Sequence, residues 1–561
     1  MKIINWLKMN EKWVIVLFVA VFIIIRLFGI HSPLHQDEYK WPLIVNPASV
    51  SDTSIPHPPL SEFIYRFAGH IVGYGIGFRY VPLFFGTLNL ILFYYVLRMR
   101  FGRRTATIGA TLFTLSYFSI LASLMVDTDG AIMPFFFLLG LISYYKIQEL
   151  RGKQKIVWTA ALLASLVGGF LIKVSFLLAV GAIAAEFLWE RRMLVSKKDL
   201  LKYSGYAAVF LASLVIILFI AQKIFPFFHL ASSVSYWEHF AQLHRNWFQT
   251  GIQVVKALLY SSPLLILTPF FLRRDQSTKL VPYISYLIFG FIFYIILFDF
   301  SLGALDRYLQ FIVIPLCAIV AVILDSGTRQ LQRESRTYLW LGMAIAAGLF
   351  LVQFIPHYVP SLYPKAAWIP RFVSLKWNFL YPFSGGSGPL GFYVSFLFMS
   401  LSWLVSILFL IMGIVRKNVR NGIIIMMVII GLSYNAVFAE EYFFGHINGS
   451  APKVLSHAVE FIKNDPEITK VTVYNDNGGY EIQQIGKYRK RLYTDPQFDI
   501  HEKAASLNMY KEYYLEVDIP KIDPTSIYRA YLDSCKIIFH ESDRAINANV
   551  YDCRNAPDIK V

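Results

Sequence analysis

The sequence predicts a polytopic α-helical membrane protein, with about 13 transmembrane helices, that ends in an extracytoplasmic α/β domain. Of its 561 residues, 56% are hydrophobic and 16% are charged, and the mean hydropathy is +0.51. Apolar runs of about 20 residues, enough to cross a bilayer as a helix, recur as far as residue 438. After Glu440 charges are frequent and no such run occurs, so we expect two domains, residues 1–439 and 440–561.

The apolar runs define the expected order of helical spans. They cover residues 13–30, 78–97, 105–124, 131–146, 156–172, 174–190, 202–222, 252–272, 280–298, 308–325, 337–355, 390–414 and 421–438. Lys and Arg residues cluster at alternate ends of these runs, beginning with Lys2, Lys8 and Lys12 before the first one. By the positive-inside rule, the N-terminus is therefore cytoplasmic and the C-terminal domain lies outside. We expect a multi-pass protein of the cell (inner or plasma) membrane.

The sequence shows no sign of nucleotide or nucleic-acid binding. The formal net charge of +16 arises from the basic loops that set the topology, so we expect no nucleic-acid partner. No P-loop, dinucleotide-binding glycine pattern or seryl nucleophile elbow occurs. Neither a Cys-x-x-Cys nor a paired His motif is present, so no zinc site is expected.

Two acidic clusters fall on the predicted outer side of the membrane. Asp37 and Glu38 follow the first span, and Asp127 and Asp129 precede the fourth. Carboxylates at membrane depth are costly, so they are usually either paired or functional. For an isolated Asp-Glu pair, a solvated turn after a helix is the commoner explanation. The second cluster on the same side favours a shared, outward-facing site.

Cationic groups fall on the same predicted side. Lys173 lies between two apolar runs, and Arg307 precedes another. A lone Lys at a helix end can instead extend toward the lipid headgroups, and Arg307 has Asp306 and Asp299 as alternative partners. His57 is more often a local hydrogen-bonding residue than a metal ligand, because no partner His or Glu lies at ligand spacing. A divalent metal stays open without support from ligand spacing, and no other cofactor is implied.

Two segments are expected near the outer membrane interface. Residues 59–73 carry Leu60, Phe63, Ile64, Phe67 and Ile71 at helical spacing, which predicts an amphipathic helix that begins at Pro-Pro and ends at Gly73. A loop helix packed on other protein is an equal alternative. Residues 356–389 combine rings and cations, a composition that suits an anionic headgroup, although an anchoring belt is commoner. They are Tyr358, Tyr363, Lys365, Trp368, Arg371, Lys376, Trp377 and Tyr381.

The C-terminal segment has the pattern of a small α/β domain. A helix is expected over residues 454–464, and strands over 471–474, 537–539 and 550–551. Cys535 and Cys553 flank the two late strands in an oxidising compartment, so a disulfide between them is expected, with two free thiols as the alternative. Cys317 lies within a span and is most simply a buried packing residue.

The order and sidedness of several motifs resemble those of the GT-C membrane glycosyltransferases. The motifs are Asp37-Glu38, His57-Pro-Pro-Leu60, Arg79, Phe101-Gly-Arg-Arg104, Thr128-Asp129-Gly130, Leu171-Ile-Lys173 and Arg307-Tyr308 with Pro315. Within that class, the sequence is most similar to the protein O-mannosyltransferase-like family, and within it to the lipid A aminoarabinose transferase branch. The motifs span roughly residues 10–330, and the expected outer α/β domain is also similar to that branch.

The resemblance implies inverting transfer of one sugar from a polyprenyl-phosphate donor to a hydroxyl acceptor on a lipid, glycan or protein outside the membrane. It implies that Asp37 is the base and that Asp129 orients the acceptor or the base. Glu38 and Asp127 are the weaker candidates for these two roles. The residues implied near the donor phosphate are Lys173, Arg307, Arg79, His57 and Tyr308. The implied partners are therefore the lipid-linked donor, the acceptor and membrane lipids.

The chain departs from the family pattern in one motif. His57 replaces the Lys that often precedes Pro-Pro, and Pro56 replaces the Glu found in aminoarabinose transferases, so neither aminoarabinose as the sugar nor a metal on that Glu is implied. Two other functions were weighed. A flippase for lipid-linked sugars would need polar residues deep in several spans and repeat symmetry, and an oligosaccharyltransferase would be expected to carry a Trp-Trp-Asp-type motif after residue 440. Neither pattern is evident.

Overall fold

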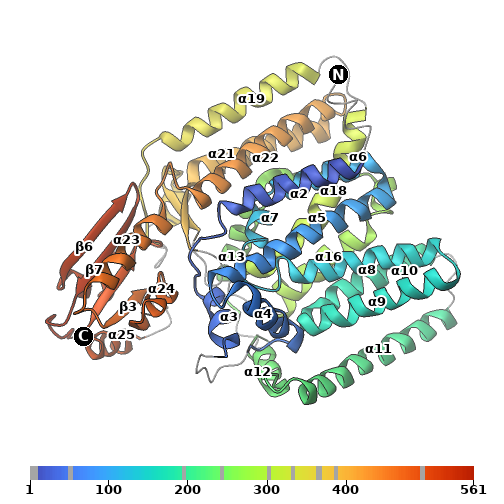
Figure 1. Ribbon diagram of the computed structural model, residues 1–561. Coiled ribbons are helices and arrows are strands. Elements are labelled where there is room, and N and C mark those ends of the chain that lie inside the picture. The colour runs from blue at the N-terminus through green and yellow to red at the C-terminus, as the bar shows by residue number, and fades with distance from the viewer. Residues whose placement is uncertain are drawn as a thin grey trace. The chain divides into compact units, whose positions relative to one another are not determined.

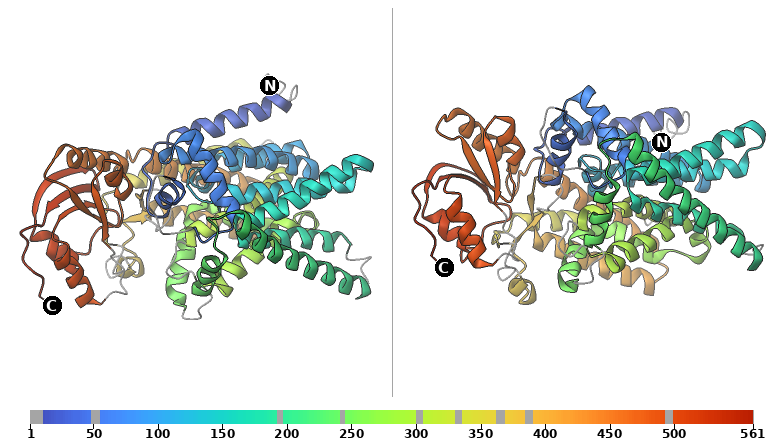
Figure 2. Two further views of the ribbon diagram at one scale, coloured as in Figure 1. Left: turned by 60° about the horizontal axis from the view of Figure 1, so that its bottom comes forward. Right: turned by 90° about the horizontal axis from the view of Figure 1, so that it is seen from below.

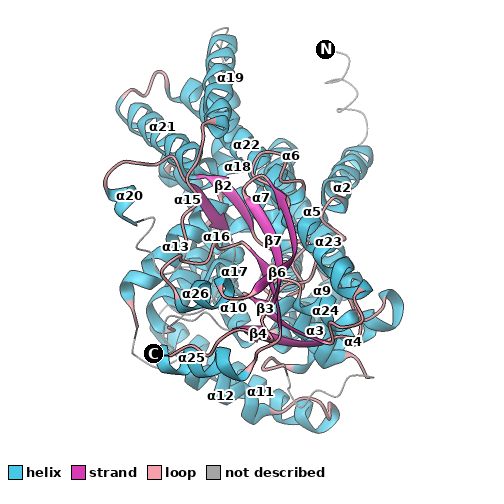
Figure 3. Ribbon diagram, turned by 90° about the vertical axis from the view of Figure 1, so that its left-hand side faces the viewer, coloured by secondary structure: helices cyan, strands magenta, loops and turns pink. Residues whose placement is uncertain are grey.

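The computed structural model describes most of the chain in two compact units. The described residues are 11–47, 55–191, 197–240, 245–299, 305–329, 335–361, 369–383, 390–492 and 499–560. The first unit comprises residues 1–30, 41–339 and 408–432, and the second comprises residues 31–40, 340–407 and 433–561. The described strands all belong to the second unit (Figure 3). The predicted domain boundary at residue 440 stays a prediction.

The first unit is helical, and its longer helices are labelled in Figure 1. Its elements are α2 (Glu11–Leu27), α4 (Pro59–Val72), α5 (Tyr80–Phe101), α6 (Arg103–Leu115), α7 (Tyr117–Ala122), α8 (Ile132–Glu149), α9 (Gly152–Ile172), α10 (Leu177–Arg191), α11 (Lys197–Ile224), α12 (Leu230–Phe240), α13 (Trp247–Tyr260), α14 (Ser262–Leu267), α15 (Arg274–Ser277), α16 (Val281–Phe291), α17 (Leu305–Tyr308) and α18 (Val313–Arg329). Four more helices cross between the units: α3 (Asp37–Val45), α19 (Ser335–Leu351), α21 (Phe396–Val415) and α22 (Arg420–Phe443). Helices α8, α9 and α10 stay together in every view (Figure 2).

The helices confirm the multi-span membrane fold. Within the described residues, seven helices are long and apolar enough to cross a membrane, or eight if the bent pair α13–α14 counts as one span. The seven are residues 76–101, 152–172, 201–224, 309–327, 336–354, 396–415 and 420–443, and each contains or overlaps a predicted span. The remaining predicted spans are shorter, broken or more polar helices. The segment 156–172, a weak prediction, lies within the full-length helix α9.

The predicted span 105–124 is broken, and a buried cation explains the break. Helix α6 ends at Leu115 and α7 begins at Tyr117. Arg26 of α2 is fully buried and donates to the backbone carbonyl of Thr114 at 3.1 Å. It also donates to the hydroxyl groups of Ser119 at 3.1 Å and Ser123 at 2.6 Å. The first of these bonds occupies the carbonyl of Thr114 near the break, which lowers the cost of the backbone turn inside the bundle.

Helix α4 forms as predicted, from the Pro-Pro pair to Gly73, whose φ of 80° ends it. Its exposed residues are the apolar Phe63, Phe67 and Ile71, together with His70. The opposite face packs against protein and includes the buried Glu62, which pairs with Arg66 at 2.6 Å. An apolar face turned outward is what a helix at a membrane interface requires.

The described part of residues 356–389, the segment rich in aromatic residues, belongs to the second unit. Tyr363, Lys365 and Trp368 lie outside the described residues. The rest forms α20 (Ile369–Val373) and an antiparallel hairpin of β1 (Leu380–Phe383) and β2 (Phe392–Ser395), in which Leu380 faces Ser395. The sequence analysis did not predict this hairpin, because its aromatic residues had been interpreted as an interface belt.

The C-terminal segment forms a five-stranded mixed sheet in the order β4-β3-β5-β7-β6. Its strands are β3 (Lys470–Tyr474), β4 (Tyr488–Leu492), β5 (Tyr513–Val517), β6 (Lys536–Asp543) and β7 (Ile546–Asp552). Strands β4, β3 and β5 are parallel, and β7 is antiparallel to β5 and β6. The predicted helix and strands are all present, so the α/β fold is confirmed.

Alternating residues of the strands pack into two hydrophobic cores, one on each face of the sheet. Val471, Val473 and Leu515 pack with α23 (Ala451–Asn464) and α24 (Gly479–Gln484) on one face. Tyr474 and Tyr514 pack with α25 (Ile500–Met509) and α26 (Ile527–Asp533) on the other. The predicted disulfide between Cys535 and Cys553 is confirmed, and Cys317 is buried and free.

Candidate active site

The second acidic cluster lies in a tight loop between α7 and α8. Three side chains from other elements hold its backbone carbonyls. Arg79 donates to Leu124 at 2.8 Å, Tyr65 donates to Asp127 at 3.0 Å, and Asn89 donates to Ala131 at 2.7 Å. Each bond fixes a different point of the loop, so the two carboxylates are placed by the bundle and not by the loop alone.

Gly130 is required by close packing in this loop. A Cβ atom at this position would lie 2.2 Å from the side-chain oxygen of Gln310 and 2.8 Å from the carbonyl oxygen of Ala122. No side chain larger than hydrogen fits there without movement of the backbone. The Thr-Asp-Gly order therefore has a steric reason at its third residue.

Asp129 and Lys173 form a buried ion pair. The Lys173 ammonium lies 2.6 Å from Oδ2 of Asp129, and both side chains are only 3% exposed. Lys173 is the residue directly after α9, and its ammonium lies 4.6 Å from the ring centroid of Tyr308. Lys173 therefore points into protein and does not extend toward lipid headgroups.

Asp127 and Arg307 form a second buried pair beside the first. The Arg307 guanidinium lies 3.1 Å from Oδ2 of Asp127 and donates to the hydroxyl of Tyr308 at 2.7 Å. The Tyr308 hydroxyl is in turn 2.8 Å from that of Tyr236 on α12. Of the alternative partners for Arg307, Asp299 lies 3.8 Å from Arg245, and the side chain of Asp306 lies outside the described residues. Carboxylates and cations from three segments, the α7–α8 loop, the end of α9 and α17, thus converge in one cluster, and α12 adds the hydroxyl of Tyr236.

Burying the charged side chains of this cluster costs free energy, and the ion pairs within the cluster offset only part of that cost. Burial raises the pKa of Asp129 to about 6, with Lys173 acting in the opposite direction. Oδ1 of Asp129 is buried without a hydrogen-bond partner among the described residues. A buried ion pair is rarely a net gain in stability over apolar packing, so its retention needs another reason. A carboxylate with one unused oxygen and two nearby cations can accept a proton while the cations bind an anion.

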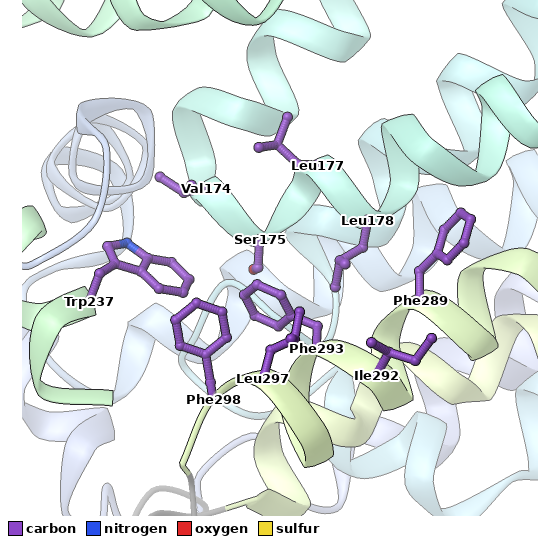
Figure 4. A pocket seen from close by; sticks show the side chains of 10 residues that line it. All are labelled: Val174, Ser175, Leu177, Leu178, Trp237, Phe289, Ile292, Phe293, Leu297 and Phe298. Carbon is purple, nitrogen blue, oxygen red and sulfur yellow. The ribbon is translucent and has the colours of Figure 1, made fainter. Parts of the chain in front are cut away.

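An apolar pocket of about 510 Å³ begins at the residues that follow Lys173 (Figure 4). Its lining includes Val174 and Ser175 after α9, Trp237 of α12, and Phe293 and Phe298 near the end of α16. Trp237 and Phe298 approach each other across it with ring centroids 5.1 Å apart. The pocket therefore begins at the residue next to Lys173 in the same unit, although the charged side chains of the cluster are not among its lining residues.

Asp37 and Glu38 belong to the second unit and differ from each other in environment. Asp37 pairs with the exposed Lys40, and its own side chain is 28% exposed. Glu38 is fully buried and accepts a hydrogen bond from the backbone N–H of His35 at 3.2 Å, which caps the first turn of α3. Asp37 is thus the more accessible carboxylate. A common site for Asp37 and Asp129 stays a prediction.

His57 and Arg79 both contact other residues of the first unit. The His57 ring lies 3.1 Å from the carbonyl oxygen of Pro56, and its edge faces the ring of Tyr236 at 5.8 Å. Arg79 is fully buried on the loop backbone, as described above. Among the residues that the structure describes, no group of three or more His, Cys, Asp or Glu side chains is placed to hold a metal ion.

The sequence analysis missed three residues of this site. Tyr65 and Asn89 hold the loop, and Tyr236 extends the hydroxyl pair with Tyr308. Each contacts the cluster from at least 40 residues away in sequence. The one available signal was that Asn89 is a polar residue within an apolar span.

Comparison with known proteins gives one family match and whole-length structural matches. Residues 56–220 match the family described as dolichyl-phosphate-mannose-protein mannosyltransferase. The apo crystal structure of ArnT from Cupriavidus metallidurans matches with a TM-score of 0.53 at 15% identity, covering 97% of this chain and 98% of that one. The same protein bound to undecaprenyl phosphate matches with a TM-score of 0.52 at 14% identity, covering 97% and 99%. No curated protein matches the chain by sequence.

Proposed function

We propose that this chain transfers one sugar from a polyprenyl-phosphate carrier to a hydroxyl group. The chain has the fold of the GT-C membrane glycosyltransferases and matches the protein mannosyltransferase family over residues 56–220. The resemblance inferred from motif order is confirmed, and nothing in these matches supports the transporter alternative. One observation carries the proposal. Two buried carboxylate–cation pairs adjoin an apolar pocket in the same unit.

The donor fits this arrangement by its chemistry. A polyprenyl-phosphate sugar combines an apolar chain with a phosphodiester, and the pocket after Lys173 suits the first part of the chain. Lys173 and Arg307 supply positive charge for the phosphate. In this structure those charges are matched by Asp129 and Asp127, and on this proposal the donor phosphate takes the place of the two carboxylates. Donor binding would release Asp129 from Lys173.

The transfer step then balances in charge and protons. The acceptor oxygen forms a bond to the anomeric carbon, and the bond from that carbon to the phosphate oxygen breaks. The polyprenyl phosphate leaves with an added negative charge that Lys173 and Arg307 stabilise. The acceptor proton passes to a carboxylate. The resemblance assigns that base to Asp37, and Oδ1 of Asp129 is available to orient the acceptor.

A transfer assay tests the proposal. Purified protein in lipid nanodiscs would be given radiolabelled polyprenyl-phosphate sugars with envelope lipid or protein extracts as acceptors. We expect label to move to an acceptor as free polyprenyl phosphate accumulates. Movement of intact labelled lipid between leaflets of a proteoliposome, without release of sugar, would instead establish the flippase.

The topology is part of the proposal. On this proposal the N-terminus is cytoplasmic and residues 440–561 lie outside the cell membrane, and the alternation of basic loops supports this orientation. A reporter fused after Val561 should be active only on the external side. Cytoplasmic activity of that reporter would reverse the orientation.

A further inference from the structure

The C-terminal sheet contains the kind of crevice at which α/β proteins bind ligands. Strand β3 lies between β4 and β5, and all three are parallel. The chain continues from β3 to β4 on one side and then crosses to β5 on the other. Ligands of open α/β sheets bind beyond the carboxyl ends of such strands, where the strand order reverses. The loops after β3 and β5 lie at this switch point, and the region between these two loops is called the crevice below.

These two loops are bound to each other by asparagine side chains. Asn475 donates to the carbonyl oxygen of Ile519 at 3.1 Å, and Asn477 donates to that of Val517 at 3.0 Å. Asn475 and Asp476 both have positive φ, at 50° and 61°. Consecutive left-handed residues carry a backbone cost that structures accept mainly at functional sites. The geometry of this turn is therefore specified closely.

The crevice is occupied by the chain's own first acidic turn, residues 35–39. The ring of His35 lies 3.1 Å from the carbonyl oxygen of Asn475, and the Gln36 amide donates to the same oxygen at 3.3 Å. The Tyr39 hydroxyl donates to Asp476 and accepts from Arg489 of β4. These contacts join residues more than 430 positions apart within the second unit.

The contacts of Tyr39 form a charged latch, which we define as Tyr39, Asp476, Arg489 and Arg491. Asp476 is fully buried, pairs with Arg489, and lies 3.7 Å from Arg491. The Arg489 guanidinium also lies 4.8 Å from the ring centroid of Tyr39. Hydrogen bonds to charged groups are about twice as strong as neutral ones. Asp37 is half-buried and lies between Gln36 and Tyr39. Because Gln36 is bound to Asn475 and Tyr39 to Asp476, the backbone is held on both sides of Asp37.

We infer that the C-terminal α/β domain is a positioning module that uses its switch-point crevice to hold residues 35–39, and with them the carboxylate of Asp37. The inference rests on the proposed function for the role of Asp37 in turnover. Tyr39, Asp476 and Arg489 are positioning residues that act through Asp37. The domain contributes to the reaction without needing a ligand of its own at the crevice.

The full-length protein tests this with Tyr39→Phe, which removes one hydroxyl and keeps the ring. Hydrogen exchange of peptides covering residues 31–45 should rise about 10-fold, the scale of a lost hydrogen bond to a charged group. The turnover number should fall by about as much while the KM for the lipid donor stays unchanged. Tyr488→Phe is the matched control, because Tyr488 is the exposed neighbour of Arg489 on β4. It should change neither exchange nor turnover.

A double variant separates the latch from general destabilisation. If Tyr39 and Asp476 act as one unit, Tyr39→Phe combined with Asp476→Asn should be no worse than Asp476→Asn alone. Additive effects would overturn the latch, and so would unchanged exchange in Tyr39→Phe. Raised exchange with normal turnover would overturn the positioning role of the domain. If the wild type transferred no sugar, the proposed function would fail, and the exchange result would still decide whether the crevice holds the turn.

Discussion

The two acidic clusters are held by different parts of the molecule and carry different charge environments. The loop with Asp127 and Asp129 is buried in the bundle, and each carboxylate is matched by a buried cation. The turn with Asp37 contacts the loop after β3 and residue Arg489 of β4 in the C-terminal domain, and Asp37 pairs with the exposed Lys40. An exposed pair is worth little and exchanges readily, whereas a buried pair is costly to break. On the proposed function, the cluster of Asp127 and Asp129 is suited to handing its cations to the donor phosphate, and the more accessible Asp37 is suited to meeting an acceptor.

The largest expected effect comes from removing either carboxylate. Asp37→Asn and Asp129→Asn should each lower the transfer rate by about 100-fold to 10,000-fold, the usual contribution of a general base. Expression should be retained. Glu149→Gln is the control, because Glu149 is an exposed carboxylate that pairs with Lys146 three residues away. Near-normal turnover of both aspartate variants in the transfer assay would refute this assignment.

Loss of the cation should separate binding from stability. Lys173→Met leaves Asp129 as an unpaired buried charge, which typically costs about 3–5 kcal/mol. Thermal unfolding should show this loss, and the KM for donor should rise. Adding Asp129→Asn to Lys173→Met should restore stability but not activity. If the double variant remained as unstable as Lys173→Met, the pair would not be the source of the loss.

The pH dependence should separate the activity from the stability contribution of Asp129, because the two change in opposite directions. Because burial raises the pKa of Asp129 to about 6, kcat/KM should fall as the pH drops through that value. The folded state binds this proton more tightly than the unfolded state, so between about pH 4 and 6 the contribution of Asp129 to stability rises as the pH falls. Activity and this part of the stability therefore move in opposite directions. Parallel loss of both, measured by turnover and thermal unfolding, would contradict the assignment.

A smaller effect is expected at Gly130. A Cβ atom there would contact Gln310 and the backbone of Ala122, so Gly130→Ala should destabilise the protein by about 1–3 kcal/mol and lower turnover. Gly348→Ala is the matched control, because a Cβ at Gly348 in α19 would meet no atom within 4 Å. Equal effects of both variants on the melting temperature would show that the loop tolerates a side chain.

Much of the membrane fold was predictable from sequence, because long apolar runs and basic loops report the cost of polar groups in lipid directly. The positions at which helices are broken or bent were not predictable. Beside the break at Ser116 the carbonyl of Thr114 accepts a hydrogen bond from the distant Arg26, and at the 106° bend between α13 and α14 Ser262 has a positive φ of 54°. The hairpin β1–β2 was missed because aromatic residues favour strands and membrane interfaces alike.

The candidate site was predictable in its charges but not in its pairing. Asp129 and Lys173 were selected by resemblance, and their ion pair joins residues 44 positions apart. Nothing local in the sequence predicts that pairing. The contact of His35 with Asn475 spans 440 positions, and helical or strand periodicity carries no information at that distance.

Binding of the lipid phosphate alone tests the central claim, that Asp129 holds the place of the donor phosphate on Lys173. The affinity for undecaprenyl phosphate would be measured in nanodiscs for the wild type, Lys173→Met, Asp129→Asn and Asp37→Asn. We predict weaker binding for Lys173→Met, tighter binding for Asp129→Asn although transfer is lost, and unchanged binding for Asp37→Asn. Weaker binding for Asp129→Asn, or equal affinity in all four proteins, would contradict the account.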